Sequence, residues 1–106
     1  MEKIALVTGS SRGIGRAAVR KLAAAGYAVC INYRERQDCA DALVEELTAA
    51  GQRAMAVQAD VSVRQQVNDM VRRVEDAFGP VSLLVNNAGN GHGQGRMHSI
   101  RSSRGL

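Results

Sequence analysis

Short apolar runs alternate along this chain with segments in which apolar residues recur at every third or fourth position. An uninterrupted short apolar run is typical of a strand that is buried on both faces. Recurrence at three or four residues is typical of an amphipathic helix. We therefore predict four strands, at residues 3–8, 28–32, 54–58 and 81–85, and three helices, at residues 14–26, at 38–50 and from Ser62 to the Gly79-Pro80 stop.

Strands that alternate with helices in this way form a parallel sheet with right-handed crossovers. The expected order in the sheet is third, second, first and fourth strand, so the order reverses between the first and the fourth. A ligand crevice opens at such a reversal, at the carboxyl ends of the strands. The predicted fold class is therefore α/β, a Rossmann-like parallel sheet with flanking helices that is truncated after the fourth strand.

The helical periodicity also predicts which face each helix turns inward. We further expect Ser62 to cap the third helix, because a serine hydroxyl accepts a hydrogen bond from a free N–H group of the first turn. The expected inward residues are Ala17, Ala18, Leu22 and Ala25 in the first helix, Ala40, Leu43, Val44 and Leu47 in the second, and Val63, Val67, Met70, Val71 and Val74 in the third.

The periodic pattern stops after Gly89. Residues 90–106 are dominated by Gly, Ser and Arg, a composition typical of disordered segments. They hold three of the 14 Lys and Arg residues and none of the ten acidic ones, so most of the net charge of +4 belongs to them. We predict a Rossmann half-domain over residues 1–89 and an irregular or disordered basic tail over 90–106. The abrupt change also suggests a hypothesis, that the tail is read out of frame, and the coding DNA beyond codon 89 would test it.

The stretch Thr8–Gly15, which reads Thr-Gly-Ser-Ser-Arg-Gly-Ile-Gly, joins the first apolar run to the first helix. Gly9 permits a sharp turn, Gly13 permits the backbone to approach a pyrophosphate, and Gly15 permits the helix to pack closely. The N-terminus of the helix adds free N–H groups and the positive end of a dipole. The stretch therefore predicts a cradle for a dinucleotide phosphate. It contains no lysine, which excludes the phosphate-binding loop of NTPases.

Two further polar motifs follow later apolar runs. Asp60-Val61 comes after the third run, and Asn86-Asn87-Ala88-Gly89 comes after the fourth. Together with Thr8–Gly15, these motifs make residues 3–89 resemble the short-chain dehydrogenase/reductase family. The resemblance implies that Asp60 and the backbone after it contact the adenine, and that Asn87 approaches the cofactor ribose. The predicted cofactor-binding residues are Gly9, Ser10, Ser11, Arg12, Gly13, Ile14, Gly15, Arg34, Asp60, Val61, Asn87, Ala88 and Gly89.

Arg12, inside the glycine turn, and Arg34, just past the second strand, bear on the choice of cofactor. An acidic residue after the second strand would bind the ribose 2′-OH of NAD, whereas a guanidinium pairs with the 2′-phosphate of NADP. We therefore favour NADP as the cofactor over NAD. The alternative is that both arginines only face solvent, and the neighbouring Glu35 keeps NAD open.

The sequence lacks the residues that would transfer a proton. In the family that the chain resembles, a Ser and a Tyr-x-x-x-Lys follow the Asn-Asn-Ala-Gly motif, and the tyrosine is the general acid and base. Here the tyrosines are Tyr27 and Tyr33, and no lysine follows Lys21. We therefore expect part of an NADP-dependent oxidoreductase for carbonyl and alcohol hydride transfer, inactive as written. The alternative is a non-catalytic nucleotide-binding or interaction module.

Other features concern location and partners. Cys30 and Cys39 form no Cys-x-x-Cys pair, no apolar run reaches the ~20 residues of a membrane span, and a strand begins directly at the N-terminus, so we expect a cytoplasmic chain with reduced thiols. His92 and His98 have no further ligands nearby, so we predict no metal. The resemblance implies a dinucleotide partner and homo-oligomers. We expect no nucleic-acid or membrane partner, and aggregation of the chain alone, because the fourth strand would leave an unpaired edge.

Overall fold

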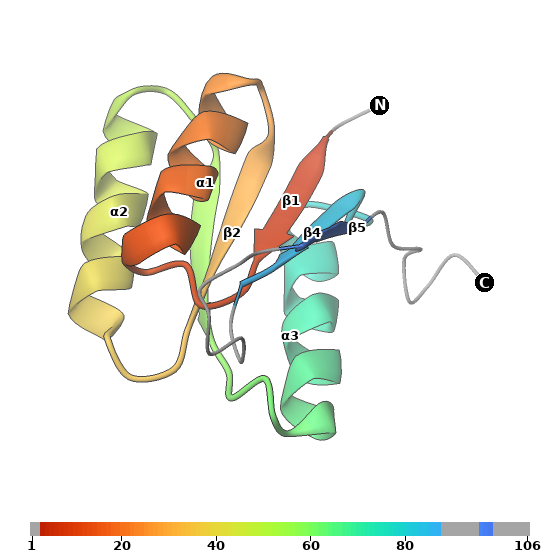
Figure 1. Cartoon of the computed structure of the whole chain (residues 1–106). Coiled ribbons are helices and arrows are strands. Elements are labelled where there is room, and N and C mark those ends of the chain that lie inside the picture. Colours follow the sequence, from red (N-terminus) through yellow and green to blue (C-terminus); the bar gives the residue numbers. More distant parts are fainter. Residues whose placement is uncertain (1–2, 88–95, 99–106) are drawn as a thin grey trace.

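The computed structural model describes residues 3–87 and 96–98 of the 106-residue chain. Strands and helices alternate over the described part as the sequence predicted (Figure 1). The strands are β1 (Ile4–Val7), β2 (Ala28–Tyr33), β3 (Ala54–Gln58), β4 (Leu83–Asn86) and β5 (Arg96–His98), and the helices are α1 (Gly13–Ala24), α2 (Gln37–Ala49) and α3 (Arg64–Ala77).

The sheet has the order β3-β2-β1-β4-β5. Its first four strands run parallel, which confirms the predicted order and the Rossmann-like class. Val7 of β1 lies level with Ile31 of β2 and with Val85 of β4. Because parallel strands in this register end at the same edge, the loops that follow β1, β2 and β4 all begin there.

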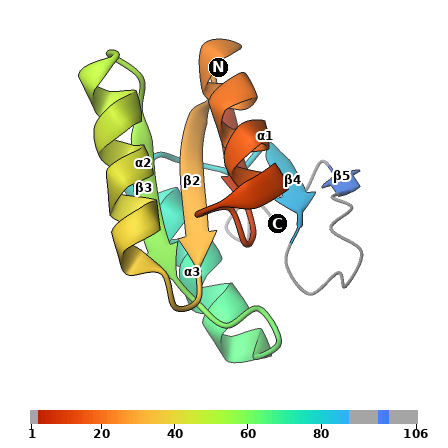
Figure 2. The same ribbon diagram turned by 60° about the vertical axis from the view of Figure 1, so that its left-hand side comes forward.

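Two layers of helices cover the sheet. Helices α1 and α2 lie on one face and α3 lies on the other (Figures 1 and 2). Successive residues of β1 divide between the two faces, with Ala5 and Val7 in the core cluster of α1 and α2, and Ile4 and Leu6 in that of α3. This division explains why the strands read as continuous apolar runs, since both faces of β1 are buried.

The inward face of α1 differs in part from the prediction. The buried residues of α1 are Gly15, Val19 and Ala23, which lie four positions apart. Leu22 packs against the core as predicted, whereas Ala17 and Ala25 are exposed. Burying the larger valine removes more apolar surface from water than burying an alanine, so the helix turns Val19 inward. The prediction for α2 is confirmed, because Ala40, Leu43 and Leu47 are buried and Val44 packs against them.

The inward stripe of α3 is confirmed at Met70 and Val74, which are buried. Val63 does not belong to that stripe, because the residue is 40% exposed. The reason is its position, since Val63 is the N-cap residue of α3 and has an extended backbone with φ of −106°. The helical periodicity was therefore extended one residue too far at the start of α3.

The prediction that the sheet ends in an unpaired fourth strand is wrong over part of β4. Residues 96–98 form β5, which pairs antiparallel with residues 84–86 of β4. Three residues give too little alternation for a pattern to reveal a strand, and β5 lies within a segment rich in Gly and Ser. The backbone groups of β4 that would template aggregation are in this way partly covered.

Candidate functional site

The glycine loop between β1 and α1 has the backbone geometry that the sequence predicted. Gly9 and Gly13 adopt positive φ angles of 58° and 67°, a region that favours glycine. Arg12 is the N-cap residue of α1, and no side chain caps the helix there. No acidic residue lies in the first turn of α1 either. The positive end of the helix dipole therefore meets no negative side chain of its own turn, as an anion site requires.

Gly15 is the tightest point of this loop. A Cβ atom added to Gly15 would lie 2.7 Å from the carbonyl oxygen of Gly9 and 2.8 Å from Nδ2 of Asn87. Only glycine fits there without a shift of the backbone. Around Gly13, in contrast, an added Cβ would find no atom within 4 Å. The described residues thus leave open space on the side of the loop where the sequence predicts a pyrophosphate.

Asn87 connects the end of β4 to this loop. Its backbone N–H donates to Oγ1 of Thr8 at 2.9 Å, and its side-chain Nδ2 donates to the carbonyl oxygen of Gly9 at 3.1 Å. The hydroxyl of Thr8 in turn donates to Oδ1 of Asn86 at 3.2 Å. Oδ1 of Asn87 is buried and finds no hydrogen-bond partner in the described part of the chain. Such an orphaned acceptor next to the loop is a place for a ligand hydroxyl to donate.

Asn32, near the end of β2, is a residue of this site that the sequence reasoning missed. It is only 2% exposed. Its Oδ1 accepts from the backbone N–H of Gly9 at 2.9 Å, and its Nδ2 donates to the carbonyl oxygen of Ala59 at 3.2 Å and to that of Val57 at 3.4 Å. The signal was a lone amide at the end of an otherwise apolar strand.

Ser10 strengthens the same junction. The backbone N–H of Ser10 donates to the carbonyl oxygen of Asn32 at 2.9 Å. The Ser10 hydroxyl donates to the carbonyl oxygen of Val7 at 2.6 Å and accepts from the N–H of Asn32 at 3.2 Å. Because Ser10 is fully buried, its hydroxyl serves the loop itself and is not offered to a ligand.

Two adjacent clefts open beside the glycine loop and share Gly9 and Arg34. The first, of about 250 Å³, holds the basic side chains and is called the arginine cleft here. The second, of about 180 Å³, is called the Asp60 cleft. The arginine cleft is lined by Gly9, Ser11, Arg12, Tyr33, Arg34, Glu35 and Arg36, and the Asp60 cleft by Gly9, Asn32, Arg34, Ala59, Asp60, Val61 and Ser62.

Arg34 stands between the two clefts. Its Nε lies 3.7 Å from Oδ2 of Asp60, and its side chain is 68% exposed. An ion pair at that distance and exposure is weak and leaves most of the guanidinium open to another anion. Arg36 is held by Asp38 at 3.2 Å, whereas Arg12 makes no ion pair with the described residues. Two cations thus remain available in the arginine cleft, against the single carboxylate of Glu35.

Asp60 is fixed by the residue two positions further on. Oδ1 of Asp60 accepts from the hydroxyl of Ser62 at 2.6 Å and from its backbone N–H at 3.0 Å. These hydrogen bonds, with the nearby charge of Arg34, lower the pKa of the Asp60 carboxyl. The prediction that Ser62 caps α3 is wrong, because its hydroxyl is engaged by Asp60 and α3 begins at Arg64.

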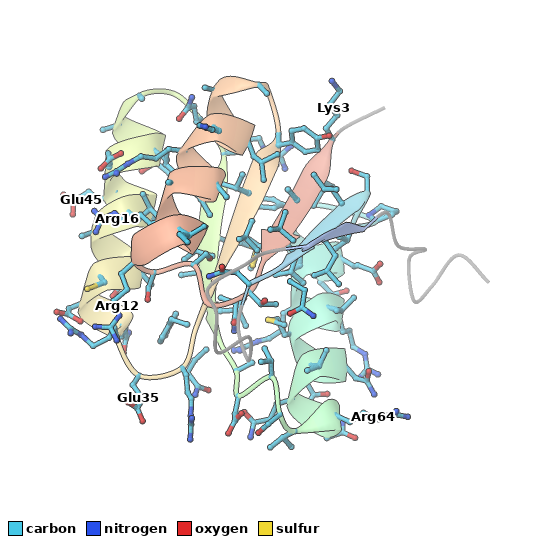
Figure 3. The ribbon with its side chains drawn as sticks, viewed as in Figure 1. Lys3, Arg12, Arg16, Glu35, Glu45 and Arg64 are labelled. Carbon is cyan, nitrogen blue, oxygen red and sulfur yellow. The ribbon has the colours of Figure 1, made fainter. Side chains whose placement is uncertain are left out.

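The structure brings the described members of the predicted set to one edge of the sheet. Figure 3 shows Arg12 and Glu35 at the end of the molecule opposite to Lys3. Ile14 is 62% exposed on α1, and Val61 is half-buried beside the Asp60 cleft. Ala88 and Gly89 lie outside the described residues. The binding roles of all these residues stay predictions.

A larger cleft, of about 490 Å³, lies at the other end of the sheet. Its walls include Lys3, Tyr27 and Arg53, and none of the predicted cofactor-binding residues lines it. Among residues 3–87 and 96–98, no group of His, Cys, Asp and Glu is placed to hold a metal ion. Within the same residues, no helix is both long and apolar enough to cross a membrane.

The cradle at Gly13, the orphaned oxygen of Asn87 and the arginine cleft all fit a dinucleotide, and this fold with this loop defines a nucleotide-binding α/β protein. Sequence comparison narrows the class. Residues 3–104 match the family described as short chain dehydrogenase. The chain belongs to the short-chain dehydrogenase/reductase family.

Similar proteins extend well beyond the matched region. The chain is 49% identical over 89 residues to the 3-oxoacyl-(acyl-carrier-protein) reductase FabG of Staphylococcus epidermidis, an alignment that covers 84% of this chain and 36% of that protein. The chain therefore spans about a third of the length of the curated relative that it matches.

Comparison with solved structures also finds proteins that this chain matches over part of their length. A blue fluorescent protein from a metagenomic library, in complex with NADPH, superposes with a TM-score of 0.80 at 49% identity. A short-chain dehydrogenase from Burkholderia cenocepacia, in complex with NADP, superposes with a TM-score of 0.79 at 49% identity. Each match covers 83% of this chain and 36% of the other.

Proposed function

We propose that this chain is the cofactor-binding part of an NADP-dependent oxidoreductase that transfers hydride between NADPH and a carbonyl or alcohol. The observation that carries the proposal is the arginine cleft, in which Arg12 and Arg34 stand beside the glycine loop. A guanidinium at the end of the second strand suits a 2′-phosphate, where an acidic residue would suit a ribose hydroxyl. The complexes of two similar proteins with NADPH and NADP support this choice.

Each part of the cofactor has a place in this proposal. The diphosphate lies over Gly13 and the free N–H groups that begin α1. The 2′-phosphate lies in the arginine cleft, between Arg12 and Arg34. The adenine lies in the Asp60 cleft, where the Asp60 carboxylate accepts from its amino group. The ribose on the nicotinamide side donates a hydroxyl to the orphaned oxygen of Asn87.

The proposed chemistry divides between the cofactor and the chain. The bound cofactor supplies or accepts the hydride. The residues described here bind and orient it, and in the proposed assignment they move no proton. The substrate stays open, because the chain spans about a third of the relative that it matches. A cytoplasmic location, expected from the two free thiols, belongs to the same proposal.

The test compares nucleotide binding by the starting protein and by Arg34→Asp. The starting protein should bind NADP(H) more tightly than NAD(H), because each charge-assisted contact to a 2′-phosphate contributes roughly 1.5–3 kcal/mol. Arg34→Asp should remove or reverse that preference. Titration calorimetry with both nucleotides measures it. Arg72→Asp, on the exposed surface of α3, makes the same change of charge away from the clefts and should keep the preference.

Equal affinity of the starting protein for the two nucleotides would contradict NADP selection and would mean that Arg12 and Arg34 only face solvent. The alternative function, a non-catalytic nucleotide-binding or interaction module, is favoured by one observation. No Tyr-x-x-x-Lys occurs in the 106 residues. A stable complex with another protein that forms without any reductase activity would support that alternative.

A further inference from the structure

Asn32 joins three segments that the proposed ligand would span. Its side chain binds the N–H of Gly9 in the glycine loop and the carbonyl oxygens of Ala59 and Val57 at the end of β3. The glycine loop is the proposed diphosphate site, and the residues after Ala59 form the Asp60 cleft. One amide thus sets the distance between the two halves of the site.

The position of Asn32 leaves its amide no other function in the described structure. The residue is 2% exposed, and both polar atoms of its side chain have partners. Ser10 holds the backbone of the same residue on both sides, since its N–H donates to the Asn32 carbonyl oxygen and its hydroxyl accepts from the Asn32 N–H. The glycine loop is therefore fastened to β2 by backbone and side chain together.

A loop with two glycines at positive φ needs such fastening. Gly9 and Gly13 have no side chain that would restrict their φ and ψ angles, so the loop by itself samples many shapes. Binding a ligand to a loop that must first be ordered costs affinity, and a loop held in the binding shape avoids that cost. The Gly9–Asn32 hydrogen bond removes freedom at the point where the chain leaves β1.

We propose that Asn32 is a positioning residue, which holds the glycine loop at a fixed distance from the Asp60 cleft so that one dinucleotide meets both. The inference rests on the proposed function and extends it to a buried residue whose side-chain amide is engaged by the protein itself. Because Asn32 acts on the loop, which NAD and NADP share, it contributes equally to both. Arg34, in contrast, is proposed to bind the 2′-phosphate, which only NADP carries.

This difference separates Asn32 from a residue that contacts the 2′-phosphate. Asn32→Ala should weaken binding of NADP(H) and of NAD(H) by the same factor, about tenfold, since it removes the hydrogen bond to the loop at Gly9 and the two to the end of β3. The ratio of the two affinities should stay at the value of the starting protein. Arg34→Ala should change the ratio, because it should weaken NADP(H) binding more than NAD(H) binding.

Leu47→Ala is the matched control for stability. Leu47 is buried in α2, far along the helix from the clefts, so its loss opens a cavity in the core without touching the loop. Titrations are run at a temperature at which circular dichroism shows each variant folded. Leu47→Ala should then bind both nucleotides as the starting protein does. Loss of affinity in Leu47→Ala equal to that in Asn32→Ala would overturn the positioning role.

Amide hydrogen exchange tests the position of the loop without a ligand. The Gly9 N–H should be protected in the starting protein and in Leu47→Ala, and unprotected in Asn32→Ala. Asn32→Ser is also neutral and its side chain is too short to bridge the Gly9 N–H and the Ala59 carbonyl oxygen, so it should behave as Asn32→Ala does. If Asn32→Ala fails to fold, Asn32→Ser carries the comparison.

The outcomes separate this inference from the proposed function. Unchanged affinity and unchanged Gly9 protection in the Asn32 variants would overturn the positioning role and leave NADP binding intact. A starting protein that binds neither nucleotide would overturn the proposed function and the ligand part of this inference together. A ratio of affinities that shifts in Asn32→Ala would show that Asn32 acts on the 2′-phosphate and would also overturn the role proposed here.

Discussion

At the scale of single residues, Gly15 shows how closely the loop, α1 and β4 approach one another. We predict that Gly15→Ala lowers the free energy of unfolding by about 2 kcal/mol and weakens nucleotide binding. Overpacking lowers the stability of the fold by up to about 3 kcal/mol, and the higher helix propensity of alanine offsets about 1 kcal/mol of that loss. The cost arises because the added Cβ would meet Gly9, Ser10 and Asn87 at 2.7–2.8 Å. Chemical denaturation and calorimetry measure the two effects.

Gly13→Ala is the comparison for this prediction. Its φ of 67° strains an alanine by about 1–2 kcal/mol, but no atom crowds the new Cβ. Gly13→Ala should therefore lose stability without displacing Asn87. Equal shifts of the Asn87 amide signals in the two variants would contradict the close approach at Gly15.

The two cysteines should differ in reactivity. Burial raises the pKa of the Cys30 thiol to about 12, so Cys30 holds its proton in the folded protein at pH 8, whereas Cys39 is half-buried. We predict that iodoacetamide at pH 8 modifies Cys39 alone, and that both cysteines react in denaturant. Mass spectrometry counts the adducts. Two adducts on the folded protein would contradict the burial of Cys30.

The raised pKa of Cys30 also predicts how the free energy of unfolding changes at high pH. A raised thiol pKa means that the folded state favours the neutral form. The contribution of Cys30 is therefore complete below the ordinary thiol pKa of 9.0, and it is lost as the pH rises from there toward about 12. Cys30→Ala should unfold with a weaker dependence on pH above 9 than the starting protein.

The candidate site residues that could be named from the sequence are those with special backbone or charge properties. The glycines and Arg12, Arg34 and Asp60 stand out in sequence because few other residues suit their positions. Asn32 did not stand out, since an amide at the end of a strand has many ordinary uses. Its role depends on the carbonyls of Val57 and Ala59, which only the register of β2 with β3 brings within reach.

At the scale of elements, the periodicity predicted the positions of strands and helices along the chain well. It predicted less well which face of a helix is buried. The strand β3 (Ala54–Gln58) has the predicted bounds, because its mainly apolar run lies between the turn at Gly51 and the polar Asp60. The predicted face of α1 was wrong at Ala17 and Ala25, because alanines carry too little apolar surface to decide it against Val19. Strand β5 was missed, because it forms through a tertiary contact with β4. A run of three residues is too short to show a strand pattern in the sequence.

That pairing leads to a prediction about self-association. A chain that ends after residue 90 lacks β5 and leaves the backbone of residues 84–86 unpaired at the sheet edge. We expect it to form more oligomers than the full chain at equal concentration. Size-exclusion chromatography with light scattering measures the mass of each species. A truncated chain as monomeric as the full chain would contradict the covering role of β5.

At the scale of the whole molecule, we predict no turnover by the chain of 106 residues. General acid–base catalysis contributes typically ~10²–10⁴-fold, and no tyrosine follows Tyr33 to supply it. NADPH oxidation with a panel of carbonyl substrates measures activity by the loss of absorbance. Binding of NADPH by the same sample is the control that the fold is present. Turnover at a rate ordinary for a reductase, in a preparation free of longer relatives, would contradict the prediction.

The hydrogen bonds that Asn87 makes have a consequence for the order of assembly. The bond to Thr8 joins residues 79 positions apart, and the bond to Gly9 spans 78. During synthesis the glycine loop emerges early, but the amide that holds the Gly9 carbonyl emerges after three helices have already been made. Closing so long a stretch of chain carries a larger entropy cost than closing a short one. Nucleotide affinity followed against chain length would therefore time the docking of β4, the last parallel strand to reach the sheet.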